Sequence, residues 1–316
     1  MPVTRRSVLL SAAAVATGLW TAACSSLPGT EEASFPSTED VTGALRDLVK
    51  KAGRETFQSV DVYPDGTLRA ALLMLRGGVQ TFGYRDSWHK ETYDKKSILT
   101  SPVSVPLSGL PLGRLPDYHR VAGAEARRIG IDVDYVGKIR VTADVTPEPV
   151  GLTLNGKGTV PTLEPEQVSG VRSAVAEIVA AYGRKAERVG SFNGFVHVDA
   201  NVAGSRAAVR IIRYPTLAAL ASVDQESQFD PDLLFDPSNF DPTVAVTRKA
   251  TIAKEAGVDG TVWDWEYRRP PMGGDPLVSY GIGSKGPSTR VWLGKDGKVA
   301  SVVDGDCPKN SGWCPG

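Results

Sequence analysis

The chain has 316 residues, of which 41% are hydrophobic and 23% charged, and its 36 basic side chains balance its 36 acidic ones. These values are ordinary for a protein that folds around a buried core, and they exclude a largely disordered chain. Removing residues 1–23 takes away two arginines and no acid, which leaves 34 basic and 36 acidic side chains. Nothing in this balance would attract nucleic acid electrostatically.

The N-terminus has the layout of an export signal. Arg5 and Arg6 precede an apolar run over 8–23, which is too short to span a bilayer comfortably. The run ends in the small residues Ala22 and Ala23, where a signal peptidase would cut, and Cys24 follows. We therefore predict a signal peptide over residues 1–23 and no membrane-spanning helix in the mature chain.

The segment Thr21-Ala22-Ala23-Cys24 resembles the lipobox of bacterial lipoproteins. The resemblance implies that Cys24 is acylated on its sulfur, freed by cleavage before it and acylated again on its amine, which fastens the chain to a membrane. Residues 4–10 look like a twin-arginine export signal, with Val8 in place of the usual Phe, so the twin-arginine and general routes both remain open. We expect a lipid-anchored protein on the extracytoplasmic face of a plasma or outer membrane.

Two short segments flank the predicted folded body. Residues 24–40 are rich in Ser, Glu, Thr and Pro without apolar periodicity, which is typical of a flexible tether. Residues 307–316 hold Cys307 and Cys314, and an oxidising compartment favours a structural disulfide between them, although the two cysteines can also stay reduced.

Residues 41–165 are predicted to form a first α+β unit. A helix is expected over 41–54, since Gly53 suits a helix C-terminus. Strands over 59–63 and 68–75, a Pro-rich loop, and a helix from Asp117 to Gly130 follow. The sequence then predicts strands that bury one face, and finally a hairpin turn through Asn155-Gly156. The residues expected on that strand face are Val133, Tyr135, Ile139 and Val141.

Residues 166–306 are predicted to repeat this order. A helix is expected over 167–184, strands over 195–199 and 207–214, and a second helix from Asp241-Pro242 to Gly257. A strand over 263–268 and a hairpin turn at 295–298 complete the unit.

A short similarity links the two units, because residues 126–132 (ARRIGID) recur as 253–259 (AKEAGVD), 127 positions later. We therefore predict an α+β fold of two tandem similar units, each with helices packed on an antiparallel sheet. The alternative is that two unrelated α+β stretches look alike.

Three segments could carry chemistry. Gly281, Gly283 and Gly286 match a dinucleotide-binding pattern, but a strand-like segment follows where a helix is needed, so we predict a loop. Residues 230–241 gather four acids whose spacing fits no EF-hand, and we predict turn and cap roles for them. An aromatic stripe such as that at Trp263, Trp265 and Tyr267 can bind glycans or a partner. We predict that it is core under the helices, because Asp264, Glu266 and Arg268 occupy the opposite strand face.

Hydrolase motifs are absent from the sequence, and the polar cluster of Asp117 and His119 is predicted to be a surface or helix-capping feature. The function we predict is non-enzymatic: an envelope lipoprotein that binds or scaffolds, with its membrane anchor and an envelope protein, glycan or lipid as partners, and with no cofactor or metal. One alternative is a hydrolase assembled from His119, Asp117 and Asp264. Another is a lipid carrier with an apolar cavity between sheet and helices.

Overall fold

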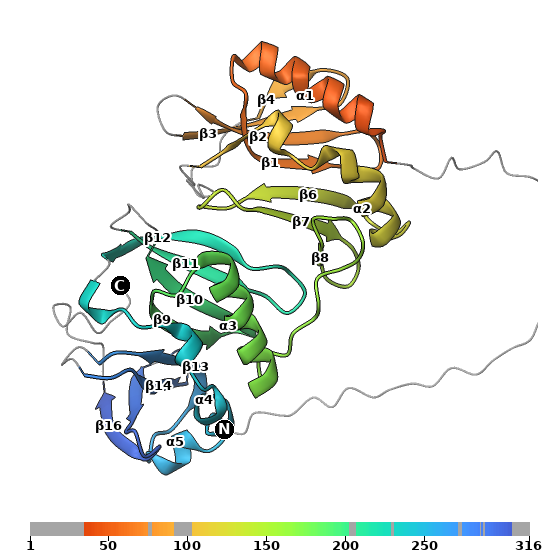
Figure 1. The fold of residues 1–316 in the computed structure, drawn as a ribbon. Coiled ribbons are helices and arrows are strands. Elements are labelled where there is room, and N and C mark those ends of the chain that lie inside the picture. Colours follow the sequence, from red (N-terminus) through yellow and green to blue (C-terminus); the bar gives the residue numbers. More distant parts are fainter. Residues whose placement is uncertain are drawn as a thin grey trace, which may run out of the picture. The chain divides into compact units, whose positions relative to one another are not determined.

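The computed structural model describes residues 35–74, 78–91, 103–201, 207–228, 231–270, 274–284, 286 and 288–304. The predicted signal peptide, Cys24, tether residues 24–34 and the Cys307–Cys314 pair lie outside these residues. Two antiparallel sheets of eight strands each dominate the described part, with few helices (Figure 1). The prediction of a tandem two-unit layout is confirmed at this level. In the described residues, every helix is too short or too polar to traverse a bilayer.

The first half of the chain builds sheet A. Its helices are α1 (Thr38–Ala52), η2 (Leu107–Gly109), η3 (Leu112–Arg114) and α2 (Leu115–Ala122). Its strands are β1 (Thr56–Val62), β2 (Leu68–Met74), β3 (Gly78–Tyr84), β4 (Trp88–Lys90), β5 (Val105–Pro106), β6 (Arg128–Val133), β7 (Ile139–Asp144) and β8 (Val150–Leu152). They lie in the order β4-β3-β2-β1-β6-β7-β8, with β5 also paired to β1.

Local chemistry explains where α1 begins and ends. The Ser37 side chain accepts a hydrogen bond from the Asp40 amide at 3.1 Å, which caps the first turn. Gly53 ends the helix with φ of 62°, a conformation that costs glycine little. Leu45 and Leu48 on the inner face of α1 are fully buried in one apolar core with the strands of sheet A.

The second half builds sheet B. Its helices are α3 (Val168–Tyr182), η4 (Pro231–Leu233), η5 (Pro237–Asn239), α4 (Thr243–Thr247) and α5 (Ile252–Glu255). Its strands are β9 (Ala186–Phe192), β10 (Phe195–Asn201), β11 (Ala207–Arg213), β12 (Leu220–Gln228), β13 (Thr261–Arg268), β14 (Leu277–Gly283), β15 (Thr289–Leu293) and β16 (Val299–Asp304). They lie in the order β12-β11-β10-β9-β13-β14-β15-β16.

The aromatic stripe of β13 confirms its predicted core role at two of three positions. Trp265 is 1% exposed, and the Phe240 ring stacks on Tyr267 with 4.6 Å between centroids, inside the core of sheet B. Trp263 is the exception. A register shift between Val262 and Asp264 displaces it from the alternation, and its indole N–H donates to the Gly283 carbonyl at 2.9 Å.

Three details of the predicted repeat are wrong. First, Gly130 does not stop a helix but lies inside β6, opposite Asp61 of β1. Second, the two similar segments differ in structure, because residues 126–132 are mostly strand whereas 253–259 span the end of α5. Third, Tyr135 does not continue a strand, because residues 134–138 form a tight turn in which Gly137 has φ of 82°. The turn is held by the Asp134 carboxylate, which accepts from the amides of Val136 and Lys138.

Each half also has more strands than predicted, since β3, β4, β5, β9, β12 and β14 had no counterpart among the predicted strands. Other expectations are confirmed. Gly297 has φ of 74° in the turn between β15 and β16, and the carboxylates of Asp236 and Asp241 cap the turns that follow them. Gly281 and Gly283 lie in β14 rather than in a loop, while a strand, β15, follows them as predicted.

Main-chain hydrogen bonds join residues of the two halves. The Tyr135 amide donates to the Ala221 carbonyl at 3.1 Å, and the Gly151 amide donates to the Thr216 carbonyl at 2.7 Å. At Gly151 a Cβ atom would lie 3.1 Å from that same carbonyl oxygen, so the close approach of the two backbones requires glycine. The turn between β6 and β7 is thereby held beside β12.

Asp61 should make the stability of sheet A depend on pH. Burial raises its pKa to about 6, although Arg128 lies 3.3 Å away. A carboxyl whose pKa is higher in the folded state contributes stability below its unfolded pKa of 3.8 and loses it as the pH rises through 6. Asp61→Asn should therefore gain up to about 3 kcal/mol relative to the parent between pH 3.5 and 7. Urea unfolding of both proteins across this range checks it, and a constant difference would contradict it.

Candidate functional site

The candidate site is organised by α3. Val171, Ala174 and Ile178 on its inner face are almost completely buried against sheet B, so the helix is held firmly. Its last turn leads into Gly183, where φ is 101°, and the chain then passes through Arg184 and Lys185 into β9. Two cavities flank this end of the helix.

The first cavity, which we call the junction pocket, has a volume of about 560 Å³ and takes its walls from both halves of the chain. The turn between β6 and β7, the end of α3, and strands β10 and β11 all contribute. Its lining residues are Val136, Lys138, Ala181, Tyr182, Gly183, Arg184, Lys185, Ala200, Asn201, Val209 and Ile211.

The junction pocket is cationic. Lys138, Arg184 and Lys185 belong to its lining, and no lining residue is acidic. The nearby Asp134 is not a lining residue, and its carboxylate accepts hydrogen bonds from two amides of its own turn and, at 2.7 Å, from the Tyr182 hydroxyl. Burial, followed by the charge of Asp134, raises the pKa of Tyr182, so this hydroxyl stays neutral.

A buried acceptor also belongs to this lining. The Oδ1 atom of Asn201 is shielded from solvent and has no hydrogen-bond partner among the described residues. Lys138 is held over the Tyr182 ring, with its Nζ 5.4 Å from the ring centroid. Val136 and Ala181, which are partly exposed, give the pocket apolar surface, whereas Ala200, Val209 and Ile211 are buried in the core of sheet B. The pocket therefore suits a ligand that has both an anionic group and an apolar part.

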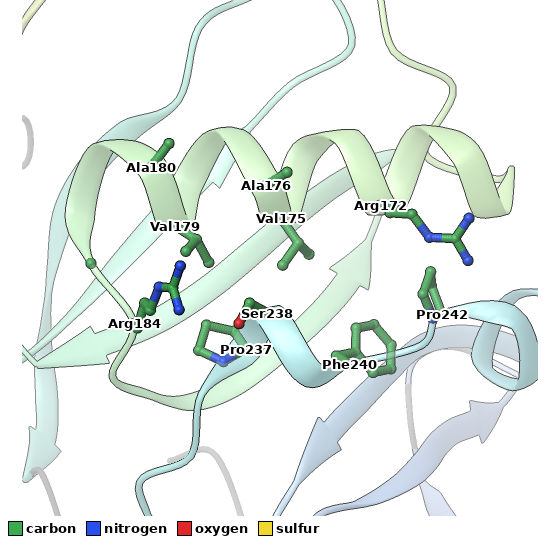
Figure 2. A pocket seen from close by; sticks show the side chains of 11 residues that line it. Arg172, Val175, Ala176, Val179, Ala180, Arg184, Pro237, Ser238, Phe240 and Pro242 are labelled. Carbon is green, nitrogen blue, oxygen red and sulfur yellow. The ribbon is translucent and has the colours of Figure 1, made fainter.

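The second cavity, which we call the α3 groove, has a volume of about 550 Å³ and runs along the other flank of the helix. Figure 2 shows Val175 and Val179 of α3 facing Pro237 and Phe240 of the segment around η5. The remaining lining residues are Arg172, Ala176, Ala180, Gly183, Arg184, Ser238 and Pro242.

An arginine stands at each end of the α3 groove. Arg172 lies 3.3 Å from Asp241, and Arg184 lies 3.9 Å from Asp236. In both pairs the arginine side chain is more than half exposed, so the pairs contribute little and a ligand could replace either carboxylate.

Sheet B also buries charge on the face opposite its apolar core. Glu266 lies 2.8 Å from Arg188, 3.2 Å from Arg268 and 3.5 Å from Arg290, and it is 6% exposed. Burial alone would raise the pKa of Glu266, but the three guanidinium groups hold it below its usual range. The predicted charged face of β13 is therefore a buried ion-pair cluster rather than a solvated surface.

His197 sits beside this cluster. Within the part of the chain that the structure describes, neither ring nitrogen makes a hydrogen bond, and burial lowers the pKa of the imidazole to about 4. Its ring lies over Gly190, where a Cβ atom would come within 2.6 Å of the imidazole. The neutral ring therefore fills space that glycine leaves open.

The residues proposed for a hydrolase are not assembled into a site. His119 stacks on Phe35 with 3.7 Å between ring centroids, and its Nε2 has no hydrogen-bond partner in the described ranges. Asp117 forms ion pairs with Arg114 and Arg120 at the surface of α2. Asp264 belongs to sheet B, where Arg290 binds it at 2.6 Å. Within the described ranges, no group of three or more His, Cys, Asp or Glu side chains is placed to hold a metal ion.

Sequence reasoning missed the junction pocket. Its cations come from a turn in one half and from the chain after a helix in the other, which are 46 positions or more apart. The one local signal is the Arg184-Lys185 pair directly after a helix-ending glycine, and this pair is common on protein surfaces.

Comparisons with known proteins do not identify the function of the site. No family model matches the chain, and no curated protein matches it. Among solved structures, a chain of the PCNA2–PCNA3 complex from Sulfolobus tokodaii is similar over 80% of this chain and 95% of its own, at 11% identity and a TM-score of 0.15. A likeness at that score supports no statement about what this chain does.

Proposed function

We propose that this chain is a lipid-anchored, extracytoplasmic binding protein of the bacterial cell envelope that takes an anionic ligand in the junction pocket. The observation that carries the proposal is the lining itself, in which Lys138, Arg184 and Lys185 surround apolar walls without an acidic residue. Three cations in one lining favour an anionic group, and the partly exposed side chains of Val136 and Ala181 favour an apolar part beside it.

The address in this proposal comes from the sequence. A signal peptide over 1–23, acylation of Cys24 and a Cys307–Cys314 disulfide all fit a secreted, membrane-anchored body. The predicted tether over 24–40 is retained only over 24–34, because Phe35 stacks on His119 and α1 begins at Thr38. We also propose that the two halves, each with helices packed on an antiparallel sheet, arose by duplication. Mass spectrometry of membrane fractions tests the anchor: mature wild-type protein should begin at an acylated Cys24, and Cys24→Ala should lose the acyl mass.

The ligand class is tested by charge reversal in the pocket. Hexyl phosphate should bind the wild-type protein, and the Lys185→Glu variant should bind it at least about tenfold more weakly, because an attraction becomes a repulsion at close range. Titration calorimetry measures both affinities, and neutral hexanol shows how much the charge contributes. Lys254→Glu on α5 is the matched control, since Lys254 is equally exposed but lines neither cavity. Equal affinities in the two variants would contradict the proposal.

The two alternative functions are less well supported. A hydrolase would need His119 to meet a carboxylate, whereas its ring stacks on Phe35 and Asp264 is engaged by Arg290. A carrier with a lipid between helix and sheet would need space under α3, where Val171 and Ala174 are 0% exposed within the core of sheet B. Binding on the flanks and end of α3 is the function that the geometry favours.

A further inference from the structure

The junction pocket and the α3 groove share two residues, Gly183 and Arg184. Beyond its own chain neighbours, no described atom lies within 4 Å of the position that the Cβ of Gly183 would occupy. The end of α3 therefore leaves open space beside a residue that lines both cavities. Arg184 is exposed over 73% of its side chain, and its acidic neighbour Asp236 is 3.9 Å away, so its guanidinium is available on either side.

The two cavities differ in chemistry. The junction pocket holds two lysines besides Arg184, whereas the α3 groove is lined between its ends by aliphatic and aromatic side chains and one serine. That serine, Ser238, is already engaged, since its hydroxyl donates to Asp236 at 2.6 Å. From Arg172 to Gly183 the helix rises about 16 Å. The groove thus offers a long apolar strip that begins at a cationic pocket.

We infer that the ligand is a single-chain anionic amphiphile whose head group lies in the junction pocket and whose alkyl chain lies in the α3 groove. The inference rests on the proposed function and adds the second half of the ligand to it. The head group, a phosphate or a carboxylate, contacts Lys138, Lys185 and Arg184. The alkyl chain passes Gly183 and lies against Val175, Val179 and Phe240.

An alkyl chain fits this groove better than a peptide does. An extended peptide would bring amide and carbonyl groups that need hydrogen-bond partners. The main chain of α3 is occupied by its own helical bonds, and the groove walls facing each other in Figure 2 are the side chains of Val175 and Val179 on one side and of Pro237 and Phe240 on the other. An alkyl chain needs only contact with such apolar surface, which it removes from water.

Chain length provides the test. Using the complete exported chain with Cys24→Ser, so that no acyl group of its own competes, the affinities of hexyl and dodecyl phosphate are compared by calorimetry below micelle formation. Six further methylenes in a half-open groove should strengthen binding about 100-fold. Ala180→Trp and Ala176→Trp, at exposed helix positions that line the groove, should reduce that gain, measured as the ratio of dodecyl to hexyl phosphate affinity in the same variant, to less than about tenfold. Ser173→Trp is the control, because Ser173 is exposed on α3 but lines neither cavity.

The outcomes separate the inference from the proposed function. If both tryptophan variants keep the full chain-length gain, the inference is overturned, while weaker hexyl phosphate binding by Lys185→Glu would still uphold the pocket. If the wild type binds neither phosphate, the proposed function fails as well. A diazirine-bearing dodecyl phosphate gives a readout without substitutions in the groove. Cross-links to peptides containing Val175 and Phe240 support the inference, and cross-links confined to other surfaces overturn it.

Discussion

Replacing Glu266 by alanine should lower the free energy of unfolding by about 3–5 kcal/mol, a large share of the total stability of a typical domain. Glu266 is the shared carboxylate of Arg188, Arg268 and Arg290, which are themselves largely buried. Its loss leaves three guanidinium groups close together in a region of low dielectric, where their repulsion and their lost solvation are both unfavourable. Urea unfolding, with unchanged dependence on denaturant, measures the effect.

An exposed ion pair supplies the comparison for Glu266. Glu255 pairs with Arg248 on the surface around α5, with more than a third of its side chain exposed, and Glu255→Ala should cost less than about 1 kcal/mol. A loss of similar size in the two variants would mean that the cluster on sheet B is solvated in solution. Restoring most of the lost stability with Glu266→Gln would argue that hydrogen bonding rather than charge holds the cluster together.

Arg213→Ala is expected to be comparably destabilising, by about 3–5 kcal/mol, for a different reason. Arg213 is 1% exposed, and its guanidinium donates to the carbonyls of Pro161, Tyr214, Pro215 and Leu217 as well as to Glu177. One side chain thus satisfies main-chain groups of two segments more than 50 positions apart in the sequence. Truncation leaves these carbonyls without their donors.

The planar guanidinium group of Arg213 leads to a second prediction. Arg213→Lys keeps the positive charge but cannot donate in several fixed directions, so it should recover less than half of the lost stability. Thermal and urea unfolding of Arg213→Ala and Arg213→Lys measure this, and the exposed Arg172→Ala variant is the control. Full recovery by lysine would show that charge alone matters at this position.

Periodicity and capping residues predicted the elements whose sequence is amphipathic. The helices α1 and α3, the strands β1 and β2, and the turn at Gly297 all carry such local signals, and the structure places them within a few residues of the expected positions. Some of the strands that were missed are polar. In β9, for example, Arg188 is buried by pairing with Glu266, and a charged residue in a strand is indistinguishable in sequence from a solvated one.

The candidate site could not be predicted from the sequence, because its residues come together only through tertiary packing. Lys138 and Lys185 belong to one pocket only because the turn at 134–138 is held beside β12 and the end of α3. The hydrogen bond from Tyr182 to Asp134 that helps to hold it joins residues 48 positions apart. No local pattern encodes such an approach. The polar motif that could be identified locally is not a site either, because Asp117 forms surface ion pairs and the His119 ring is half-buried against Phe35.

The hydrogen bonds between main-chain atoms of the two halves bear on how the chain avoids aggregation. A strand at the edge of a sheet presents unpaired amides and carbonyls that can recruit a strand of another molecule. Gly151 of β8 donates to Thr216, and Ala221 of β12 accepts from Tyr135, so each half partly shields an edge of the other. Cutting the chain between the halves would open both edges at once. Selection against self-association therefore favours keeping the halves in one polypeptide, apart from any demand made by the ligand.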